Sequence, residues 1–315
     1  MPYRFVIISD THFFAPGHTP ADKLYWNRVL QSRAPEIAES LIDTISDLAP
    51  DFVIHCGDFT GLCDMDNFLF GCQVMDALRC PWYVAIGNHD SWYPGVRAAF
   101  SSLYDLPQGQ CYYRRDLAGL RFLFLDVAYW TSSQGQVSPY LDKELYDSGQ
   151  IRGMGPSDAE LLWLEEELAA CGDRPVILVS HAPLGFQDVY PLSTFPRGEP
   201  VQTATTSLVD RMGDMLRRDQ VRSIVRGYPN VKAAFAGHWH ISDVHHNEGV
   251  LYCQTASLRE YPFEIRLVQV QDGRLSVTTH GLKDPSFQRL SFVPEWGNIW
   301  VAGAPEDREF TLDLR

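Results

Sequence analysis

The sequence predicts an α/β fold built from mixed sheets, and three observations lead to this prediction. The first part of the chain alternates short β-rich runs with amphipathic stretches, the last part carries consecutive β-rich runs, and polar motifs directly follow several apolar runs. The 315 residues are 45% hydrophobic and 21% charged, a composition typical of a globular protein with a substantial core. We expect one mixed-sheet domain over 1–282, with 283–315 as a C-terminal extension packed on it.

The front of the chain alternates expected strands and helices in the order β-α-β-α-β. The first expected helix has apolar residues recurring on one face, and Pro35 suits its first turn. Alternation of this kind favours a parallel sheet joined by right-handed crossovers. The expected strands are 5–9, 52–56 and 82–86, and the expected helices are 35–48 and 66–78.

The rest of the chain adds a hairpin, further helices and a run of antiparallel strands. Residues 117–120 are typical of a hairpin turn, and Asp272-Gly273 is a second hairpin signal. Three connections, 13–31, 129–155 and 183–204, are long enough to be functional lids or binding loops. The expected strands are 112–116, 121–127, 176–180, 231–236, 241–245, 250–254, 263–270, 275–279 and 310–314, and the expected helices are 156–171 and 207–226.

Charge and composition exclude several classes of partner. The formal net charge is -14 and the sequence has no run of basic residues, which disfavours nucleic acid as the main partner. No apolar stretch is long enough to span a bilayer, so we expect no membrane partner. The start of the chain lacks the apolar region of a signal peptide, and the cysteines lack paired spacing. Both features favour a cytoplasmic protein with reduced thiols.

Five short polar motifs each follow an apolar, strand-like run. In open α/β sheets, ligands bind beyond the carboxyl ends of strands, so strand-end loops can bring distant motifs together. Carboxylates, imidazoles and amide oxygens are ligands for borderline divalent metals, and Gly57, Gly87 and Gly237 are expected to let the backbone turn sharply. The motifs are Asp10-Thr11-His12, Gly57-Asp58, Gly87-Asn88-His89-Asp90, Ser180-His181-Ala182 and Gly237-His238-Trp239-His240.

This ordered series resembles the calcineurin-like metallophosphoesterase superfamily, and the match runs from Asp10 to His240. The resemblance implies a four-layer α/β/β/α sandwich of two mixed sheets flanked by helices, with a dimetal site at the carboxyl ends of strands. It also implies that His89 contacts the substrate phosphate or protonates the leaving oxygen, and that Asp90 orients His89. The implied metal ligands are Asp10, His12 and His240 for the first metal, Asn88, His181 and His238 for the second, and Asp58 as the bridge.

Such a site implies hydrolysis of a small-molecule phosphoester. Two divalent metals about 3.5–4 Å apart can share a water and lower its pKa to near neutrality, so that the resulting hydroxide attacks phosphorus. The ligand set accepts two ions of Mn, Fe, Zn or Co, and the sequence does not choose among them. Histidines outside the motifs, His55 among them, are expected to have no role in the site.

Details of the motifs narrow the subfamily. The arginines that flank these motifs in protein Ser/Thr phosphatases are absent, and Gly61 stands where purple acid phosphatases have a metal-binding tyrosine. The remaining resemblance is to bacterial cyclic nucleotide (class III) and glycerophosphodiester phosphodiesterases. A phosphomonoesterase or a nucleotide pyrophosphatase is the alternative, and a non-catalytic scaffold is the remote one, which the presence of His89 argues against.

Several residues outside the motifs are candidates for substrate or partner contacts. The aromatic candidates either stack a base, cover a lipid-like group or simply pack their loops, and the arginines are candidates for a distal phosphate. Two tryptophans near the C-terminus indicate a contact surface for a homo-oligomer. These residues are Trp92, Tyr93, Tyr129 and Trp130, then Arg197 and Arg259, and finally Trp296 and Trp300.

Overall fold

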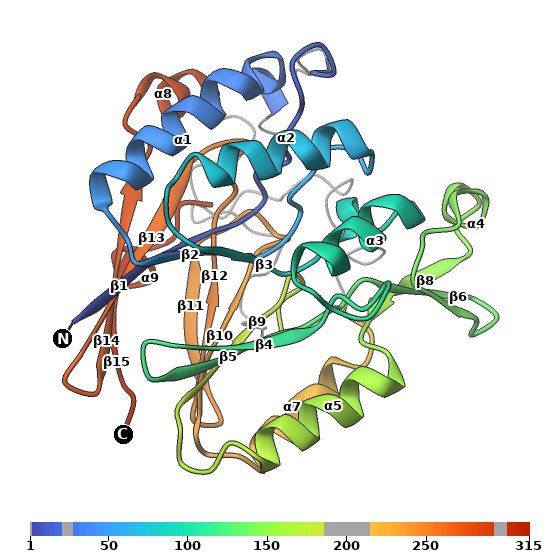
Figure 1. The fold of residues 1–315 in the computed structure, drawn as a ribbon, viewed down its shortest axis with the longest axis vertical. Helices are drawn as coiled ribbons and strands as arrows, with labels where there is room; N and C mark the ends of the chain where they lie inside the picture. Colours follow the sequence, from blue (N-terminus) through green and yellow to red (C-terminus); the bar gives the residue numbers. More distant parts are fainter. Residues whose placement is uncertain (1, 21–27, 186–214, 293–300) are drawn as a thin grey trace, which may run out of the picture.

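The computed structural model describes residues 2–20, 28–185, 215–292 and 301–315. Within these residues, two six-stranded mixed sheets pack against each other, and helices cover their outer faces (Figure 1). The predicted four-layer α/β/β/α sandwich is therefore confirmed. A third sheet of three short strands lies to one side of the two large ones.

The first large sheet contains the front of the chain. Its order is β15-β14-β13-β1-β2-β3, in which β1, β2 and β3 are parallel and the others antiparallel. The first crossover, α1, forms because Ile37, Leu41 and Ile45 recur at helical spacing and are buried, and a proline lies in its first turn. The elements are β1 (Tyr3–Ile8), α1 (Ala34–Leu48), β2 (Phe52–His55), α2 (Met65–Asp76), β3 (Trp82–Val84), β13 (Glu264–Gln271), β14 (Arg274–Gly281) and β15 (Glu309–Asp313).

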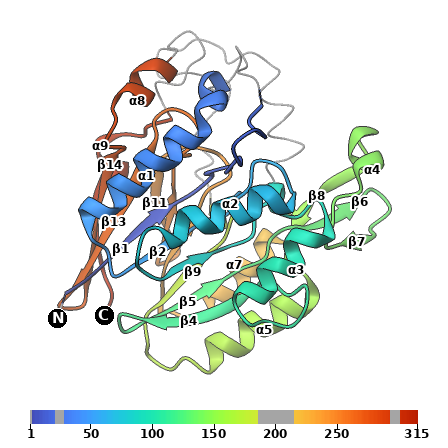
Figure 2. The ribbon, with the colours of Figure 1, turned by 45° about the horizontal axis from the view of Figure 1, so that its top comes forward.

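The second large sheet has the order β11-β12-β10-β9-β5-β4. Its four central strands are parallel, and β4 and β11 are antiparallel edges. Two helices cover its outer face (Figures 1 and 2) and bury Leu164, Leu168, Val221 and Val225 against it. The elements are β4 (Tyr113–Leu117), β5 (Leu120–Phe124), α5 (Asp158–Ala169), β9 (Val176–Val179), α7 (Arg218–Arg226), β10 (Val231–Ala236), β11 (Asp243–Asn247) and β12 (Val250–Gln254).

The main core lies between the two large sheets. The ring of Phe122 in the second sheet packs edge to face against two rings of the first sheet. Its centroid lies 5.6 Å from that of Phe5 and 5.8 Å from that of Phe52. Both predicted hairpins form: the turn residues Asp272 and Gly273 have positive φ, as do Ala118 and Gly119. Positive φ at both central residues is the geometry of tight two-residue hairpin loops, which explains the Asp-Gly signal.

Two features of the middle of the chain were not predicted. The segment after the third motif forms a helix, α3, and the 129–155 connection forms a small sheet with a short helix, which Figure 1 shows as an arm beside the sandwich. Helix α3 begins at Pro94, and proline at the first helical position is favourable. The elements are α3 (Pro94–Leu103), β6 (Tyr129–Ser132), β7 (Val137–Ser138), α4 (Lys143–Asp147) and β8 (Ile151–Gly155).

One expected helix is described only in part. Of the helix expected over 207–226, the described residues contain only α7, and 207–214 lie outside them. All seven cysteines are described and are free. Across the described ranges, no helix combines the length and apolar character needed to cross a membrane. Short helical turns complete the chain: η1 (Arg28–Arg33), η2 (Asn88–Asp90), α8 (Ser286–Ser291) and α9 (Pro305–Arg308).

Candidate metal centre

The predicted metal ligands follow the ends of β1, β2, β3, β9 and β10, and the fold brings them together. Six of the seven predicted ligands, together with His89, form three overlapping groups, and within each group the ligand atoms lie within 4.8 Å of one another. The expected clustering at strand ends is therefore confirmed. The groups are Asp10, His12 and His240; Asp58, His181 and His238; and His12, Asp58 and His89.

The first group corresponds to the predicted first metal. His240 Nε2 lies 3.1 Å from Asp10 Oδ1 and 3.5 Å from His12 Nε2. His12 Nε2 lies 3.9 Å from the same Asp10 oxygen. One carboxylate oxygen and two imidazole nitrogens thus face a common point.

The second group corresponds to the predicted second metal. His181 Nε2 lies 3.1 Å from His238 Nδ1 and 2.9 Å from Asn88 Oδ1. It also lies 3.3 Å from Asp58 Oδ1. Two imidazole nitrogens, an amide oxygen and a carboxylate oxygen therefore converge here.

Asp58 lies between the two groups and contributes one oxygen to each. Its Oδ1 faces His181, and its Oδ2 lies 3.7 Å from His12 Nε2. The same Oδ2 lies 4.0 Å from His89 Nε2, so His89 borders both Asp58 and the first group. This position of Asp58 suits the predicted bridge, and that of His89 suits contact with a substrate held at the bridge.

The hydrogen bonds of two histidines fix which ring nitrogen points into the site. His181 Nδ1 lies 3.0 Å from the carbonyl oxygen of Cys56, and His240 Nδ1 lies 2.6 Å from Glu260 Oε1. Because both partners are acceptors, each Nδ1 carries a hydrogen and each neutral ring directs the lone pair of Nε2 into the site. Lone pairs of oxygen and nitrogen facing each other at 3–4 Å repel unless a cation or proton lies among them. The donor set therefore fits two borderline divalent cations.

The backbone around the ligands is held in a rarely populated conformation. Five of the seven predicted ligands have φ between 43° and 72°, the left-handed region that non-glycine residues seldom adopt. Strain of this kind persists where the surrounding structure enforces it, and it gathers at functional sites. These ligands are Asp10, His12, Asp58, His238 and His240.

Of the three motif glycines, only Gly57 has the positive φ that sharp turning requires, at +94°. Gly87 and Gly237 are needed because other groups approach closely. A Cβ on Gly237 would lie 1.8 Å from Ser9 Oγ and 2.3 Å from Asp10 Oδ2, and one on Gly87 would lie 2.2 Å from the Asp58 backbone nitrogen. At these two positions glycine makes room for the ligands, which differs from the predicted reason.

At Asp58, His181 and His240, electrostatic interactions within the site outweigh the effect of burial, whereas burial lowers the pKa of His12 well below its usual value. Burial alone would raise the pKa of Asp58, but His181 and His89 hold that pKa well below its usual range. Burial would lower the pKa of His181, but Asp58 raises it to about 9. Burial would also lower the pKa of His240, whereas Asp10 and Glu260 raise it to about 10. Without metals, both imidazoles therefore hold a second proton at neutral pH, which a binding metal displaces.

Residues outside the motifs support the ligands, and sequence reasoning missed them. Glu260 orients His240, and the Ser9 hydroxyl donates to Asp10 Oδ2 at 2.5 Å. His55 is buried, accepts a hydrogen bond from the Gly57 backbone N–H, and lies 2.8 Å from Thr11 Oγ1. Ser9 and His55 lie in or beside a motif strand, which was a usable signal. Glu260 follows a strand without any motif, and only the fold reveals its role.

Asp90 is linked to His89 through a neighbouring loop. Its carboxylate accepts hydrogen bonds from the backbone N–H groups of Phe59, Thr60 and Gly87 and from the Thr60 hydroxyl, at 2.8 to 3.1 Å. The loop that it holds includes Gly61, whose carbonyl oxygen lies 3.3 Å from His89 Nδ1. These contacts connect Asp90 to His89 through the loop.

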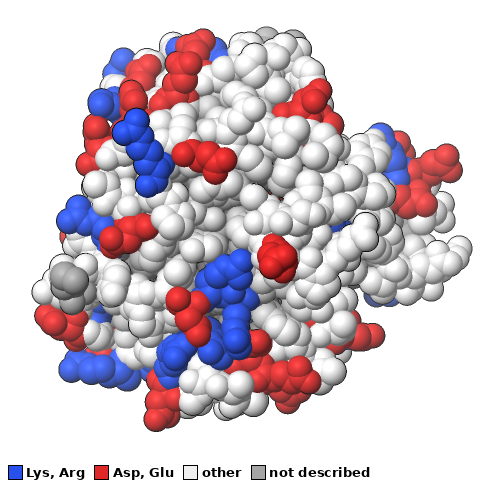
Figure 3. Space-filling view, in the orientation of Figure 1, with Lys and Arg blue, Asp and Glu red and all other residues white. Residues whose placement is uncertain are grey.

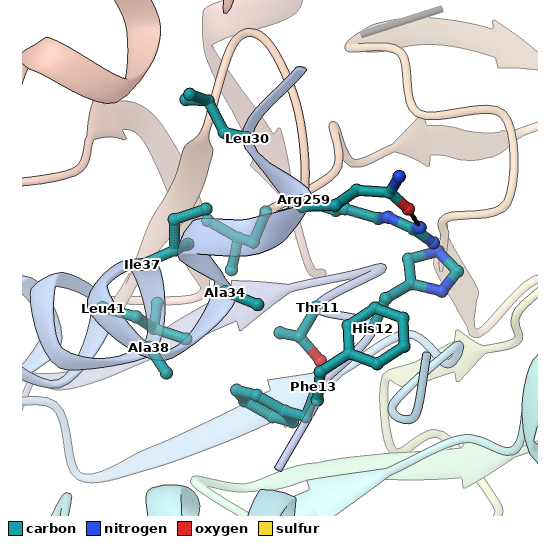
Figure 4. Close-up of a pocket in the computed structure, with 12 residues that line it drawn as sticks. Thr11, His12, Phe13, Leu30, Ala34, Ile37, Ala38, Leu41 and Arg259 are labelled. Carbon is teal, nitrogen blue, oxygen red and sulfur yellow. Dashed lines mark hydrogen bonds between the residues drawn. The ribbon is translucent and has the colours of Figure 1, made fainter. Parts of the chain in front are cut away.

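The other candidate residues lie in different surroundings. Arg259 is buried beside His12 (Figure 4), where it donates a hydrogen bond to Gln31 and lines a small pocket that is otherwise mostly apolar. Trp130 is buried and donates from Nε1 to Ser91 Oγ, and the Arg97 guanidinium lies over the ring of Tyr129. These two aromatic side chains therefore connect β6 to Ser91 and to α3. Arg197, Trp296 and Trp300 lie outside the described residues.

Comparisons with known proteins agree with this geometry. A glycerophosphodiester phosphodiesterase, GpdQ, of Enterobacter lignolyticus is 28% identical over 179 residues, which cover 56% of this chain and 55% of that protein. A probable cyclic nucleotide phosphodiesterase of Rhodococcus erythropolis is 27% identical over 253 residues, covering 75% of this chain and 68% of that one. The match thus spans little more than half the length of the first relative.

A solved structure and a family model complete the comparison. A dimetal phosphatase from Danio rerio superposes with a TM-score of 0.64 over 99% of both chains at 14% identity, which shows a shared fold. The model of the calcineurin-like phosphoesterases matches residues 3–242, a range that contains every predicted ligand. The protein belongs to the calcineurin-like phosphoesterase family.

Proposed function

We propose that the protein hydrolyses small organic phosphodiesters, of the cyclic nucleotide or glycerophosphodiester kind, with two divalent metal ions. The observation that carries this proposal is the position of Asp58, which directs one oxygen to each of two ligand groups. The phosphodiesterase relatives support the choice of a diester. The proposed ligands are Asp10, His12, Asp58, Asn88, His181, His238 and His240.

When bound, two divalent cations would neutralise phosphoryl oxygens and acidify a water molecule. The ligands are oriented before any metal binds. Cys56 holds the ring of His181 in one orientation, and Glu260 does the same for His240. Fixed donors lose little freedom on binding, and partners of ligating histidines strengthen metal affinity.

His89 is the proposed acid for the leaving group. Its side chain is 18% exposed, so it reaches the mouth of the site, and the carboxylate of Asp58 lies 4.0 Å from its Nε2. Because the Gly61 carbonyl faces Nδ1, a protonated ring can donate from Nε2 to the departing ester oxygen. Asp90 holds the loop that carries Gly61, and so it acts as a positioning residue.

The test compares bis(p-nitrophenyl) phosphate with p-nitrophenyl phosphate, using protein stripped of metal by a chelator and reloaded with Mn²⁺. The proposal predicts that hydrolysis is seen only when metal is present, and that the diester is hydrolysed in preference to the monoester. A preference for the monoester would show that the activity is that of a phosphomonoesterase and not that of a phosphodiesterase. Absence of turnover of either ester, with two metals bound, would contradict the proposal.

A further inference from the structure

The surface beside His89 carries a group of exposed apolar side chains. Leu62, Met65, Leu69 and Tyr93 have exposed fractions of 45%, 39%, 51% and 54%. They are four of the nine large hydrophobic residues that are exposed among the residues that the structure describes. We call these four residues the apolar rim. Exposed apolar groups that gather in one place mark binding surfaces more often than scattered ones do.

Contacts between two loops and a helix hold the apolar rim together. The backbone N–H of Tyr93 donates to Cys63 Sγ at 3.2 Å, which joins the loop after β2 to the loop after η2. Met65 reaches the start of α3, because a Cβ on Gly95 would lie 3.9 Å from its Cγ and Sδ. Leu69 follows Met65 by one helical turn on α2. The four side chains therefore belong to neighbouring elements.

The charge of the surrounding surface is low for so acidic a protein. In Figure 3 the surface over α2 and α3 is mostly white, whereas charged side chains gather along the left side and the lower part of the molecule. Met65 lies between two acidic residues, Asp64, which caps α2, and Asp66, whose side chain is 73% exposed. The surface next to the rim thus carries few charged side chains.

The apolar rim adjoins His89 on two sides. Leu62 directly follows Gly61, whose carbonyl oxygen lies 3.3 Å from His89 Nδ1. Tyr93 directly follows Trp92, whose ring lies against His89 with centroids 5.0 Å apart and an interplanar angle of 30°. The His89 ring thus contacts Gly61 and Trp92, and Leu62 and Tyr93 are the exposed residues that directly follow these two contacts in the chain.

We propose that the apolar rim binds the leaving group, and that the preferred substrates are phosphodiesters of a large apolar alcohol. This inference rests on the proposed function and names its substrate class. In the reaction, the oxygen of water bonds to phosphorus, the bond from phosphorus to the leaving oxygen breaks, and His89 gives its proton to that oxygen. The products are a phosphomonoester and the apolar alcohol, which the rim shields from water.

The test varies only the apolar size of the leaving group. Methyl 4-methylphenyl phosphate and methyl 4-butylphenyl phosphate release phenols of similar acidity, so any difference in kcat/KM reports apolar contact. For the Mn²⁺-loaded protein we expect kcat/KM to be roughly tenfold higher for the butyl compound, since three added methylene groups become partly buried.

Variants locate the contact. Leu62→Ser and Tyr93→Ser should each lower the butyl-to-methyl ratio of kcat/KM at least threefold. The matched control is Leu162→Ser, because Leu162 is 59% exposed on α5, in the layer that covers the other sheet. This control should keep the ratio of the unmodified protein. An unchanged ratio in both rim variants would overturn the proposal.

Other outcomes separate this inference from the function on which it rests. A ratio near one, with bis(p-nitrophenyl) phosphate turned over, would overturn the substrate class alone. If no ester is hydrolysed, the proposed function fails, and calorimetric binding of the inert 4-butylbenzyl- and 4-methylbenzylphosphonates still measures the same preference. A dimer that Leu62→Ser dissociates, detected by light scattering, would assign the rim to a second copy and also overturn the proposal.

Discussion

The two halves of the metal centre are held in place by different kinds of group. In the first half, side chains take a large part, since Ser9 donates to Asp10 beside the backbone N–H of His238, and Glu260 orients His240. In the second half the backbone does so, because the carbonyl of Cys56 orients His181. Gly57 also belongs to this half, since a Cβ there would lie 2.7 Å from the His181 ring.

The two halves should therefore respond to different substitutions. A partner that is a side chain can be changed without moving the chain, so the first half is open to adjustment by a single residue. A backbone carbonyl has no such variant, and the second half changes only when the loop itself moves. Asp58 belongs to both halves, so a substitution at Asp58 should impair both of them.

Asp58→Asn should have the largest effect. Losing the charge that faces both halves should lower kcat for bis(p-nitrophenyl) phosphate by at least about 10³-fold, which is equivalent to roughly 4 kcal/mol of transition-state stabilisation. Steady-state kinetics with metal content measured by mass spectrometry checks this result. Asp147→Asn, at an exposed ion pair on α4, is the control. Turnover like that of the unmodified protein, in a metal-replete variant, would contradict the bridging role.

His89→Ala should separate chemistry from metal binding. His89 donates a proton in the proposed reaction and is not among the proposed ligands, so kcat should fall by roughly 10²–10⁴-fold while both metals stay bound. Kinetics and metal analysis on the same sample give the two quantities. His89 also shares a group with His12 and Asp58, so a parallel loss of metal would make it a ligand instead.

Glu260→Gln should weaken the first half alone. The amide keeps the shape of Glu260 and can still accept from His240 Nδ1, but the negative charge is lost, so metal affinity of that half should fall by roughly 10–100-fold. Calorimetric titration of metal-free protein with Mn²⁺ resolves the weaker and the tighter event. Glu306→Gln, at an exposed position of α9, should change neither. Equal weakening of both events would remove the distinction between the halves.

Metal binding in both halves should depend on pH. His181 and His240 have pKa values raised to about 9 and about 10, so below these values metal binding must displace a proton from each half. Affinity should therefore rise by about tenfold per pH unit in each half between pH 7 and 9. Proton release into weakly buffered solution, followed with an indicator dye, measures this exchange.

Glu260→Gln sharpens the same measurement. Because Glu260 helps to raise the pKa of His240, the variant should move the pH dependence of the first half to lower pH. The second half should keep its dependence, since His181 is governed by Asp58. Metal binding without proton release at pH 7.5 would show that neither imidazole is charged in the metal-free protein.

The sequence predicted most of the layered fold because the fold depends on local patterns. Apolar runs marked the central strands, and Asp272-Gly273 marked a tight hairpin. The small sheet β6-β7-β8 was missed because its strands are short and have few apolar residues in alternation. Helix α3 was missed because Pro94 and Gly95 favour a turn when tertiary contacts are unknown.

The ligand set was predicted from the motifs, whereas the groups that hold it were less visible. Glu260 lies 20 residues after His240 in the sequence, and nothing local relates the two. Gly87 and Gly237 were recognised, but the reason for them was not, because close approach between distant loops appears only in the fold. Local patterns thus predict which residues act, and tertiary packing decides how they are held.

The positions of the bound metals relative to Asp58 would test most directly whether Asp58 bridges them. Anomalous diffraction from a crystal of the Mn²⁺-loaded protein measures these positions. We predict two peaks about 3.5–4 Å apart, one on the Asp10, His12 and His240 side of Asp58 and one on the Asn88, His181 and His238 side. A single peak, or two peaks that do not share Asp58, would contradict a bridged pair of metals.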